Sequence, residues 1–212
     1  MAVTFAMALS ATLTTAASAE KEFHSSLKET AITSTDDGTG KTAHQVLDLA
    51  GASITCGVSS FVGSFEGKSI AEISLAAAFS GCQFVGQTAT FSMKSCQFSF
   101  AANGTFGIIT NPEAGTGKTC AEDPISFSVP SPACTVTIGP QAIAGALTYK
   151  NIKPGTTEEI TAENKATGIK YKAAGAGCPE VGEFSNGNYT TANKILTAAP
   201  PKLPEMGEFR WE

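Results

Sequence analysis

The sequence predicts an all-β protein, built as an antiparallel β-sandwich or a barrel-like meander and stapled by disulfides. Three observations favour this class. Apolar and hydroxyl-bearing residues alternate with a period of two in most segments, which places the apolar set on one face of a strand. Turn signals separate many short runs of this kind, as in sandwiches and barrels. No segment has the apolar spacing of a long amphipathic helix.

The chain begins with an uncharged, apolar segment that ends in Ala17-Ser18-Ala19. Small residues at these positions are typical of a signal-peptidase site, so we expect a signal peptide over residues 1–19. The usual Lys/Arg n-region is missing, so a true start upstream of Met1 and a buried N-terminal helix stay open as alternatives. We expect residues 20–212 to form a single β-rich extracellular domain, because no shift in composition divides them. Two stacked sub-sheets that meet near residue 102 are the alternative.

The clearest strands are residues 125–129 and 134–138, where Ile, Phe and Val alternate with Ser and Thr. The prolines at 130 and 132 lie between them and predict a turn, since proline donates no ladder hydrogen bond. Further strands are expected at 24–33, 44–50, 52–58, 69–79, 145–150, 157–164, 167–172 and 188–196. Residues 69–79 contain Ala76-Ala77-Ala78 and are the one segment in which a helix competes with a strand.

Residues 88–100 change phase part-way along. Ala89, Phe91 and Met93 share one phase of the alternation, and Cys96, Phe98 and Phe100 share the other. One strand buries both sets on the same face only with an extra residue, so we predict a bulge or a break near Lys94-Ser95. Asn103-Gly104 then predicts a turn.

Composition excludes several function classes. Charged residues make up only 16% of the chain and the net charge is -5. A nucleic-acid partner is not expected, because such proteins need a basic surface that neutralises phosphates. No cationic amphipathic stretch suits a membrane surface, and no membrane insertion is expected once the signal is removed. Phenylalanine supplies 13 aromatic residues, which we assign mainly to the core.

The six cysteines are Cys56, Cys82, Cys96, Cys120, Cys134 and Cys178. An even number in an exported chain indicates disulfides. A zinc site is not expected, because no C-x-x-C pair is present. We therefore predict neither a metal nor another cofactor.

No catalytic, cofactor-binding or metal-binding motif is predicted. Gly40-Lys41-Thr42 and Gly117-Lys118-Thr119 lack the upstream glycine of a phosphate-binding loop, and no helix is expected to follow them. Asp36-Asp37-Gly38 lacks the alternating acids and distal Glu of a calcium-binding loop. Both GKT sequences and the DDG sequence are assigned to turns.

Several segments, taken in order, resemble a multi-copy group of secreted, six-cysteine, β-rich proteins of soil actinobacteria. They are Glu22-Phe23-His24-Ser25, Phe79-Ser80-Gly81-Cys82, Met93-Lys94-Ser95-Cys96, the run from Ala133 to Gln141, Thr167-Gly168-Ile169-Lys170-Tyr171, Cys178-Pro179 and Asn186-Gly187-Asn188-Tyr189-Thr190. The resemblance runs from about residue 22 to the end of the chain. It implies export and the fold class, and it implies no activity.

Strands that are near in sequence are usually near in space in an antiparallel meander. This topology favours the pairs Cys56–Cys82, Cys96–Cys120 and Cys134–Cys178 among the many that six cysteines allow. Exchanges among Cys96, Cys120 and Cys134 are the main alternative.

The expected function is that of a secreted, non-catalytic cell-surface, binding or structural β-domain. Its expected partner is cell-wall polymer or another copy of the chain. An extracellular hydrolase is the first alternative, with Glu158, Glu159, Asp123 and His24 as candidate catalytic residues. A secreted inhibitor or effector is the second, and it would present a rigid exposed loop at residues 111–119.

Overall fold

The protein is described by a computed structural model that covers residues 21–27, 29–36, 45–49, 52–152, 159–199 and 209–212. The all-β class is confirmed. Within these residues every regular element is a strand except one short 3-10 turn, η1 (Pro112–Ala114). All strand pairs are antiparallel. The predicted signal peptide at 1–19 lies outside the described residues.

Seventeen strands are assigned within the described residues. They are β1 (Phe23–Ser25), β2 (Glu29–Asp36), β3 (Gln45–Leu49), β4 (Ala52–Glu66), β5 (Ser69–Ile70), β6 (Glu72–Phe84), β7 (Gln87–Thr88), β8 (Thr90–Ser92), β9 (Cys96–Ala101), β10 (Phe106–Thr110), β11 (Ile125–Pro130), β12 (Ala133–Ile138), β13 (Gln141–Ile143), β14 (Leu147–Ile152), β15 (Glu159–Ala174), β16 (Gly182–Ala199) and β17 (Phe209–Trp211).

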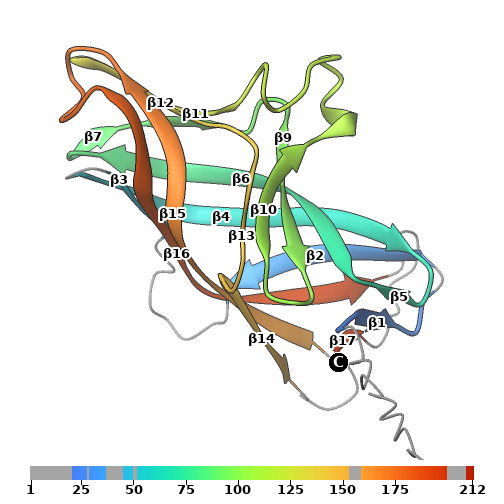
Figure 1. The fold of residues 1–212 in the computed structure, drawn as a ribbon. Helices are drawn as coiled ribbons and strands as arrows, with labels where there is room; N and C mark the ends of the chain where they lie inside the picture. The colour runs from blue at the N-terminus through green and yellow to red at the C-terminus, as the bar shows by residue number, and fades with distance from the viewer. Residues whose placement is uncertain (1–20, 28, 37–44, 50–51, 153–158, 200–208) are drawn as a thin grey trace, which may run out of the picture.

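Fourteen of the strands form one sheet, which curls into a half-barrel (Figure 1). Its order is β13-β10-β9-β6-β4-β2-β16-β15-β12-β11-β8, with β14 on β15, β3 on β16 and β4, and β7 on β6. The other three strands form a small sheet in the order β17-β1-β5. The long strands β4, β6, β15 and β16 bend across the molecule, so a single sheet encloses the core.

The strand β15 corrects one sequence prediction. Residues 157–164 and 167–172 were expected to be two strands, but Glu159–Ala174 is continuous. Its buried residues change phase between Ala166 and Ile169, and the register with β16 shifts at the same place. Gly168 has a φ of 77° there. Gly168 therefore adopts a left-handed backbone conformation and forms a β-bulge. The extra residue of the bulge lets the apolar residues before it and those after it face the same core.

The predicted break near Lys94-Ser95 is confirmed. The strand β8 ends at Ser92, β9 begins at Cys96, and Lys94 between them has a φ of 54°. The Cys96 N–H donates to the Met93 carbonyl at 3.0 Å, which closes the turn. Residues 69–79 are confirmed as extended rather than helical: Ser69–Ile70 is β5 and Glu72 begins β6.

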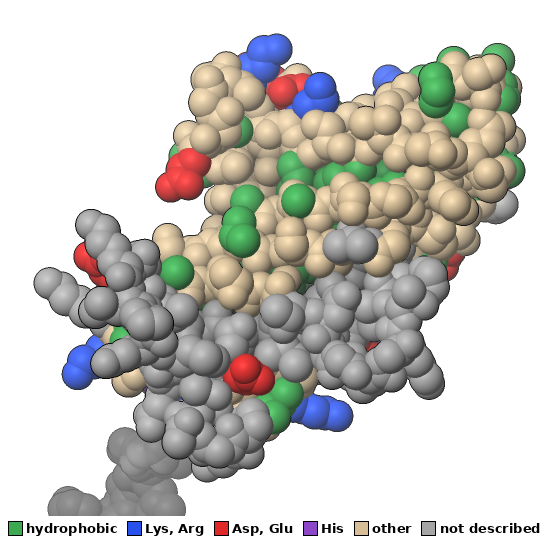
Figure 2. Space-filling model, turned by 180° about the vertical axis from the view of Figure 1, so that it is seen from behind, with side chains coloured by type: hydrophobic (Ala, Val, Ile, Leu, Met, Phe, Trp, Pro, Cys, Tyr) green, Lys and Arg blue, Asp and Glu red, His purple; other side chains and the backbone are tan. Residues whose placement is uncertain are grey.

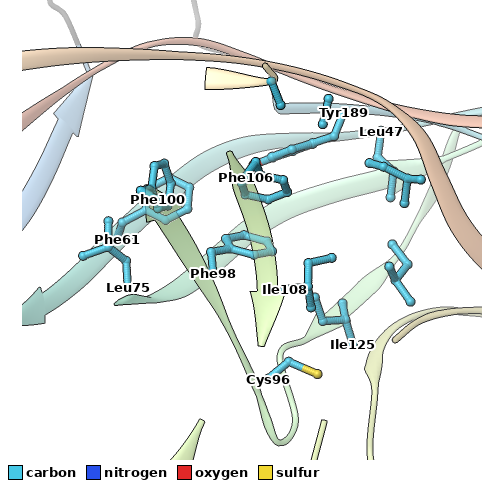
Figure 3. Close-up of a cluster of buried hydrophobic side chains, with 14 of the residues drawn as sticks. Leu47, Phe61, Leu75, Cys96, Phe98, Phe100, Phe106, Ile108, Ile125 and Tyr189 are labelled. Carbon is cyan, nitrogen blue, oxygen red and sulfur yellow. The ribbon is translucent and has the colours of Figure 1, made fainter. Parts of the chain in front are cut away.

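Aromatic side chains dominate the interior of the half-barrel. Eight phenylalanines are buried among the residues that the structure describes, and a cluster of them lies around Phe106 on β10 (Figure 3). The Phe106 ring lies 5.1 Å from the Phe98 ring and 5.8 Å from the Tyr189 ring, measured between centroids. A cavity of about 30 Å³ remains beside these rings, with almost wholly apolar walls. That space suits about one water molecule, so it is a packing void rather than a ligand site.

A side-chain amide joins β13 to β15 at the open side of the sheet. The Lys170 N–H donates to Gln141 Oε1 at 2.8 Å, and Gln141 Nε2 donates to the Lys170 carbonyl at 3.0 Å. The amide thus replaces the two hydrogen bonds that a neighbouring strand would supply. Because β13 pairs with β10, this bridge links the two halves of the curled sheet.

The two ends of the described chain are joined to each other. The backbones of Glu22 and Glu212 exchange two hydrogen bonds at 2.8 and 3.0 Å. The Trp211 indole N–H donates to the Ala102 carbonyl at 2.9 Å, and the Asn151 amide pairs with both backbone groups of Trp211 at 2.7 and 2.8 Å. Trp211 therefore fixes β17 against the main sheet.

The structure joins Cys56–Cys82, Cys96–Cys120 and Cys134–Cys178, the same three pairs that the sequence favoured. The first links β4 to β6 at directly paired positions. The second fastens the segment after β10 to β9, and the third fastens the segment after β15 to β12. Three disulfides fit an extracellular or otherwise oxidising compartment.

No helix long and apolar enough to cross a membrane is present in the part of the chain that the structure describes.

Candidate functional site

A groove of about 730 Å³ lies between the turn at residues 119–124 and the strands β12, β15 and β16. These three strands run side by side along one side of the half-barrel (left in Figure 1). A hollow of this size falls in the usual range of ligand sites. Small residues, Ala121, Pro124 and Gly139, line part of the wall.

An aromatic pair lines the groove where β15 faces β16. Tyr171 and Phe184 are directly opposite in the strand register, and their rings stack with centroids 5.1 Å apart and planes 23° apart. Tyr171 is buried, whereas Phe184 is half-buried. The Tyr171 hydroxyl donates to Asn186 Oδ1 at 3.3 Å. Stacking and this hydrogen bond hold Phe184 and Asn186 in place at the groove wall.

A row of polar and charged side chains crosses the same three strands. Thr137 on β12 pairs with Lys172 on β15, and Lys172 pairs with Glu183 on β16. The Lys172 ammonium lies 3.6 Å from the Glu183 carboxylate. Lys170 and Ser185 also line the groove and are exposed. Because Lys172 and Glu183 are the sequence neighbours of Tyr171 and Phe184, this ion pair lies on the face of the sheet opposite to the stacked rings.

The turn that forms the opposite wall is braced at several points. The Thr119 N–H and hydroxyl both donate to Glu122 Oε2, at 2.8 and 2.9 Å. Cys120 is tied to β9 by its disulfide and to Thr110 by a 3.0 Å hydrogen bond from its N–H. These contacts order the wall before any ligand arrives.

The bonds from Thr119 hold the pKa of the Glu122 carboxyl below its ordinary value. A lowered pKa means that the charged form stabilises the turn at pH values above the ordinary pKa, and that this contribution is lost as the pH falls through the lowered one. We expect the amide NMR signal of Thr119 to titrate with that low midpoint. In Glu122→Gln the signal is expected to stay constant over the same range. A wild-type Thr119 signal that does not respond to pH contradicts the brace.

The candidate residues of the hydrolase alternative are not brought together. Glu158 lies outside the described residues. Glu159 is the first residue of β15, and Asp123 lies in the turn, where its backbone carbonyl accepts from the Ser95 N–H at 3.2 Å. His24 lies on β1, with its Nε2 3.8 Å from Glu212. Among the described residues, no hydrogen bond or ion pair joins any two of these three candidates.

The loop at residues 111–119 is ordered by its own side chains. Asn111 Oδ1 accepts from the Glu113 N–H at 2.9 Å, and the hydroxyl of Thr116 lies 2.6 Å from that of the buried Ser95. The second GKT sequence lies at its end, in an exposed, non-helical segment. The first GKT sequence lies outside the described residues, as does the DDG sequence apart from Asp36.

Sequence reasoning missed the aromatic pair. It assigned no binding role to Tyr171 or Phe184, and it did not expect a strand at 182–187. Tyr171 lies opposite Phe184 because of the register of the β15–β16 hairpin. The sequence pattern did not indicate this register. Within the described ranges no group of three or more His, Cys, Asp or Glu side chains is arranged to hold a metal ion.

No protein-family model matches the chain, and no curated protein and no solved structure matches it either.

Proposed function

We propose that the protein is a secreted, non-catalytic binding domain that holds an extracellular polysaccharide, such as cell-wall polymer, in the groove between the turn at residues 119–124 and the strands β12, β15 and β16. The observation that carries the proposal is the half-buried Phe184 ring on the groove wall, backed by Tyr171, whose hydroxyl donates to Asn186 beside it. The C–H faces of a sugar ring pack on an aromatic face, and its hydroxyls need neighbouring polar groups.

Export is supported by the apolar segment at the start of the sequence, by the three disulfides and by the resemblance to secreted six-cysteine proteins. A surface role is supported by the character of one face of the molecule. On the face seen in Figure 2, uncharged polar and backbone atoms predominate and charged side chains are sparse among the described residues. Such a surface suits contact with a hydroxyl-rich polymer.

The test is co-sedimentation of the purified protein with isolated bacterial cell walls and with insoluble polysaccharides. We expect the wild type to be retained by at least one of them. Phe184→Ala is expected to weaken retention roughly tenfold, the effect of losing an aromatic contact of about 1.4 kcal/mol. Val62→Ala is the control, because Val62 is an exposed apolar residue on β4 outside the groove lining.

Absence of retention on every polymer contradicts the proposal, as does equal retention of the Phe184→Ala variant once its fold has been verified by circular dichroism. Release of soluble sugar from a retained polymer favours the hydrolase alternative instead.

A further inference from the structure

We propose that the Cys134–Cys178 disulfide is a redox-sensitive clasp: extracellular thiol compounds cleave it before the other two bonds, and its cleavage opens the seam between β12 and β15. The proposal goes beyond the proposed function and is independent of it, because its tests need no polymer. Two observations carry it: the exposure of the cysteines, and the short strand pairing that this bond reinforces.

Cys178 is the most accessible of the six cysteines, all of which lie in the part of the chain that the structure describes. The other five are buried, with exposed fractions of 0–3%. Cys178 is half-buried, and Ala176, Pro179 and Glu180 beside it are exposed. A disulfide is cleaved when a thiolate reaches one of its sulfur atoms, so access sets the rate. The two fully buried bonds react only after the surrounding strands have opened locally.

Cleavage consumes two thiol groups of the reductant. The first attacks the Cys178 sulfur as a thiolate, the bond to Cys134 breaks, and the Cys134 sulfur leaves as a thiolate that takes up a proton. The second thiol group then attacks the reductant's sulfur in the mixed disulfide and releases Cys178, which also takes up a proton. The protein disulfide is thus reduced to two thiols, and the reductant is oxidised to a disulfide.

The bond crosses a short seam of the sheet. The strands β12 and β15 pair at three positions, whereas Cys56–Cys82 lies within a ladder of nine paired positions between β4 and β6. A short ladder opens more readily once its covalent link is lost. Thr137 and Lys172 form one of the three pairs, and both line the groove. Opening of the seam therefore alters the groove.

The tip of the β15–β16 hairpin lies against the turn between β11 and β12 (Figure 1). The Gly177 N–H donates to the Ala133 carbonyl at 3.0 Å. A side chain at Gly177 would collide with the Pro132 carbonyl, so the two backbones are in direct contact. The disulfide joins this tip to β12 at Cys134, and its cleavage leaves the tip held by non-covalent contacts.

The first test is partial reduction of the native wild-type chain with dithiothreitol, followed by alkylation with iodoacetamide and peptide mass mapping. We expect Cys134 and Cys178 to be alkylated together, about tenfold faster than the other four cysteines, because the buried bonds wait for local opening. Under these conditions Cys56–Cys82 and Cys96–Cys120 should stay intact.

The second test is hydrogen exchange, measured by mass spectrometry on the protein reduced at this bond alone and on Cys134→Ala/Cys178→Ala. We expect residues 135–137 and 172–174 to exchange about tenfold faster than in the oxidised protein, at labelling times at which β4 and β6 remain protected. Cys56→Ala/Cys82→Ala is the matched control: it removes a bond outside the seam, and residues 135–137 should stay protected at the same labelling times.

Each contrary outcome overturns a stated part of the proposal. Reduction of all three bonds at one rate, or of another bond first, overturns selective cleavage. Selective reduction with unchanged exchange at residues 135–137 and 172–174 overturns the clasp. Loss of protection in every strand at once overturns it too, because the bond then holds the whole fold rather than the seam. The proposed function is unaffected by any of these results.

Discussion

Reduction of the three disulfides is expected to unfold the protein at room temperature without denaturant. The bonds join cysteines that are 26, 24 and 44 residues apart. On the chain-entropy view each contributes about 3.5–4 kcal/mol, roughly 11 kcal/mol in total. Domains are generally stable by only about 5–15 kcal/mol, so loss of all three removes most or all of the stability.

The measurement is urea unfolding followed by Trp211 fluorescence and circular dichroism, with and without reductant. Intact mass after alkylation of denatured samples counts the free thiols. The double variant Cys134→Ala/Cys178→Ala is the graded control, because it removes one bond and is expected to cost about 4 kcal/mol. If the reduced chain has six alkylated thiols and an unchanged urea midpoint, the bonds do not stabilise the fold. If the sample without reductant has six alkylated thiols, the argument for an oxidising compartment is contradicted.

The fold class followed from local patterns because each pattern has a local cause. Alternation at 125–129 and 134–138 requires only that one face of a hairpin is buried, and β11 and β12 pair accordingly, with Phe127 opposite Val136. The change of phase in the apolar alternation near Lys94 likewise predicted a break in the strand, whatever the position of the two strands in the sheet. The cysteine pairs followed because strands β4 and β6, which carry Cys56 and Cys82, are neighbours in the sheet.

The groove did not follow, because it depends on contacts between distant segments. The turn at 119–124 faces β15 and β16 only after the sheet has curled, and the curl is held in part by Gln141, whose partner Lys170 lies 29 residues further along the chain. No local pattern marks a glutamine that substitutes for a strand. The continuity of β15 was also missed, because Gly168 resembles a turn residue in sequence and acts as a bulge in the sheet.

Replacement of Phe106 by alanine is expected to destabilise the oxidised protein by about 3–5 kcal/mol. Its side chain is 1% exposed, and its ring contacts Phe98, Phe100 and Tyr189. Phe106 also lines the small apolar cavity, so truncation enlarges an existing void that the surrounding strands cannot close without moving. Phe106→Leu keeps most of the volume and is expected to cost less than the alanine variant.

Urea unfolding of the oxidised variants provides the measurement, and Phe184→Ala is the matched comparison. It makes the same substitution at a half-buried ring on the groove wall, so we expect a smaller loss of stability together with weaker polymer binding. Phe106→Ala should show the opposite pattern while it remains folded: a large loss of stability with polymer affinity retained, because the ring lies outside the groove lining. Equal destabilisation by the two variants contradicts the assignment of Phe106 to the core and of Phe184 to the site.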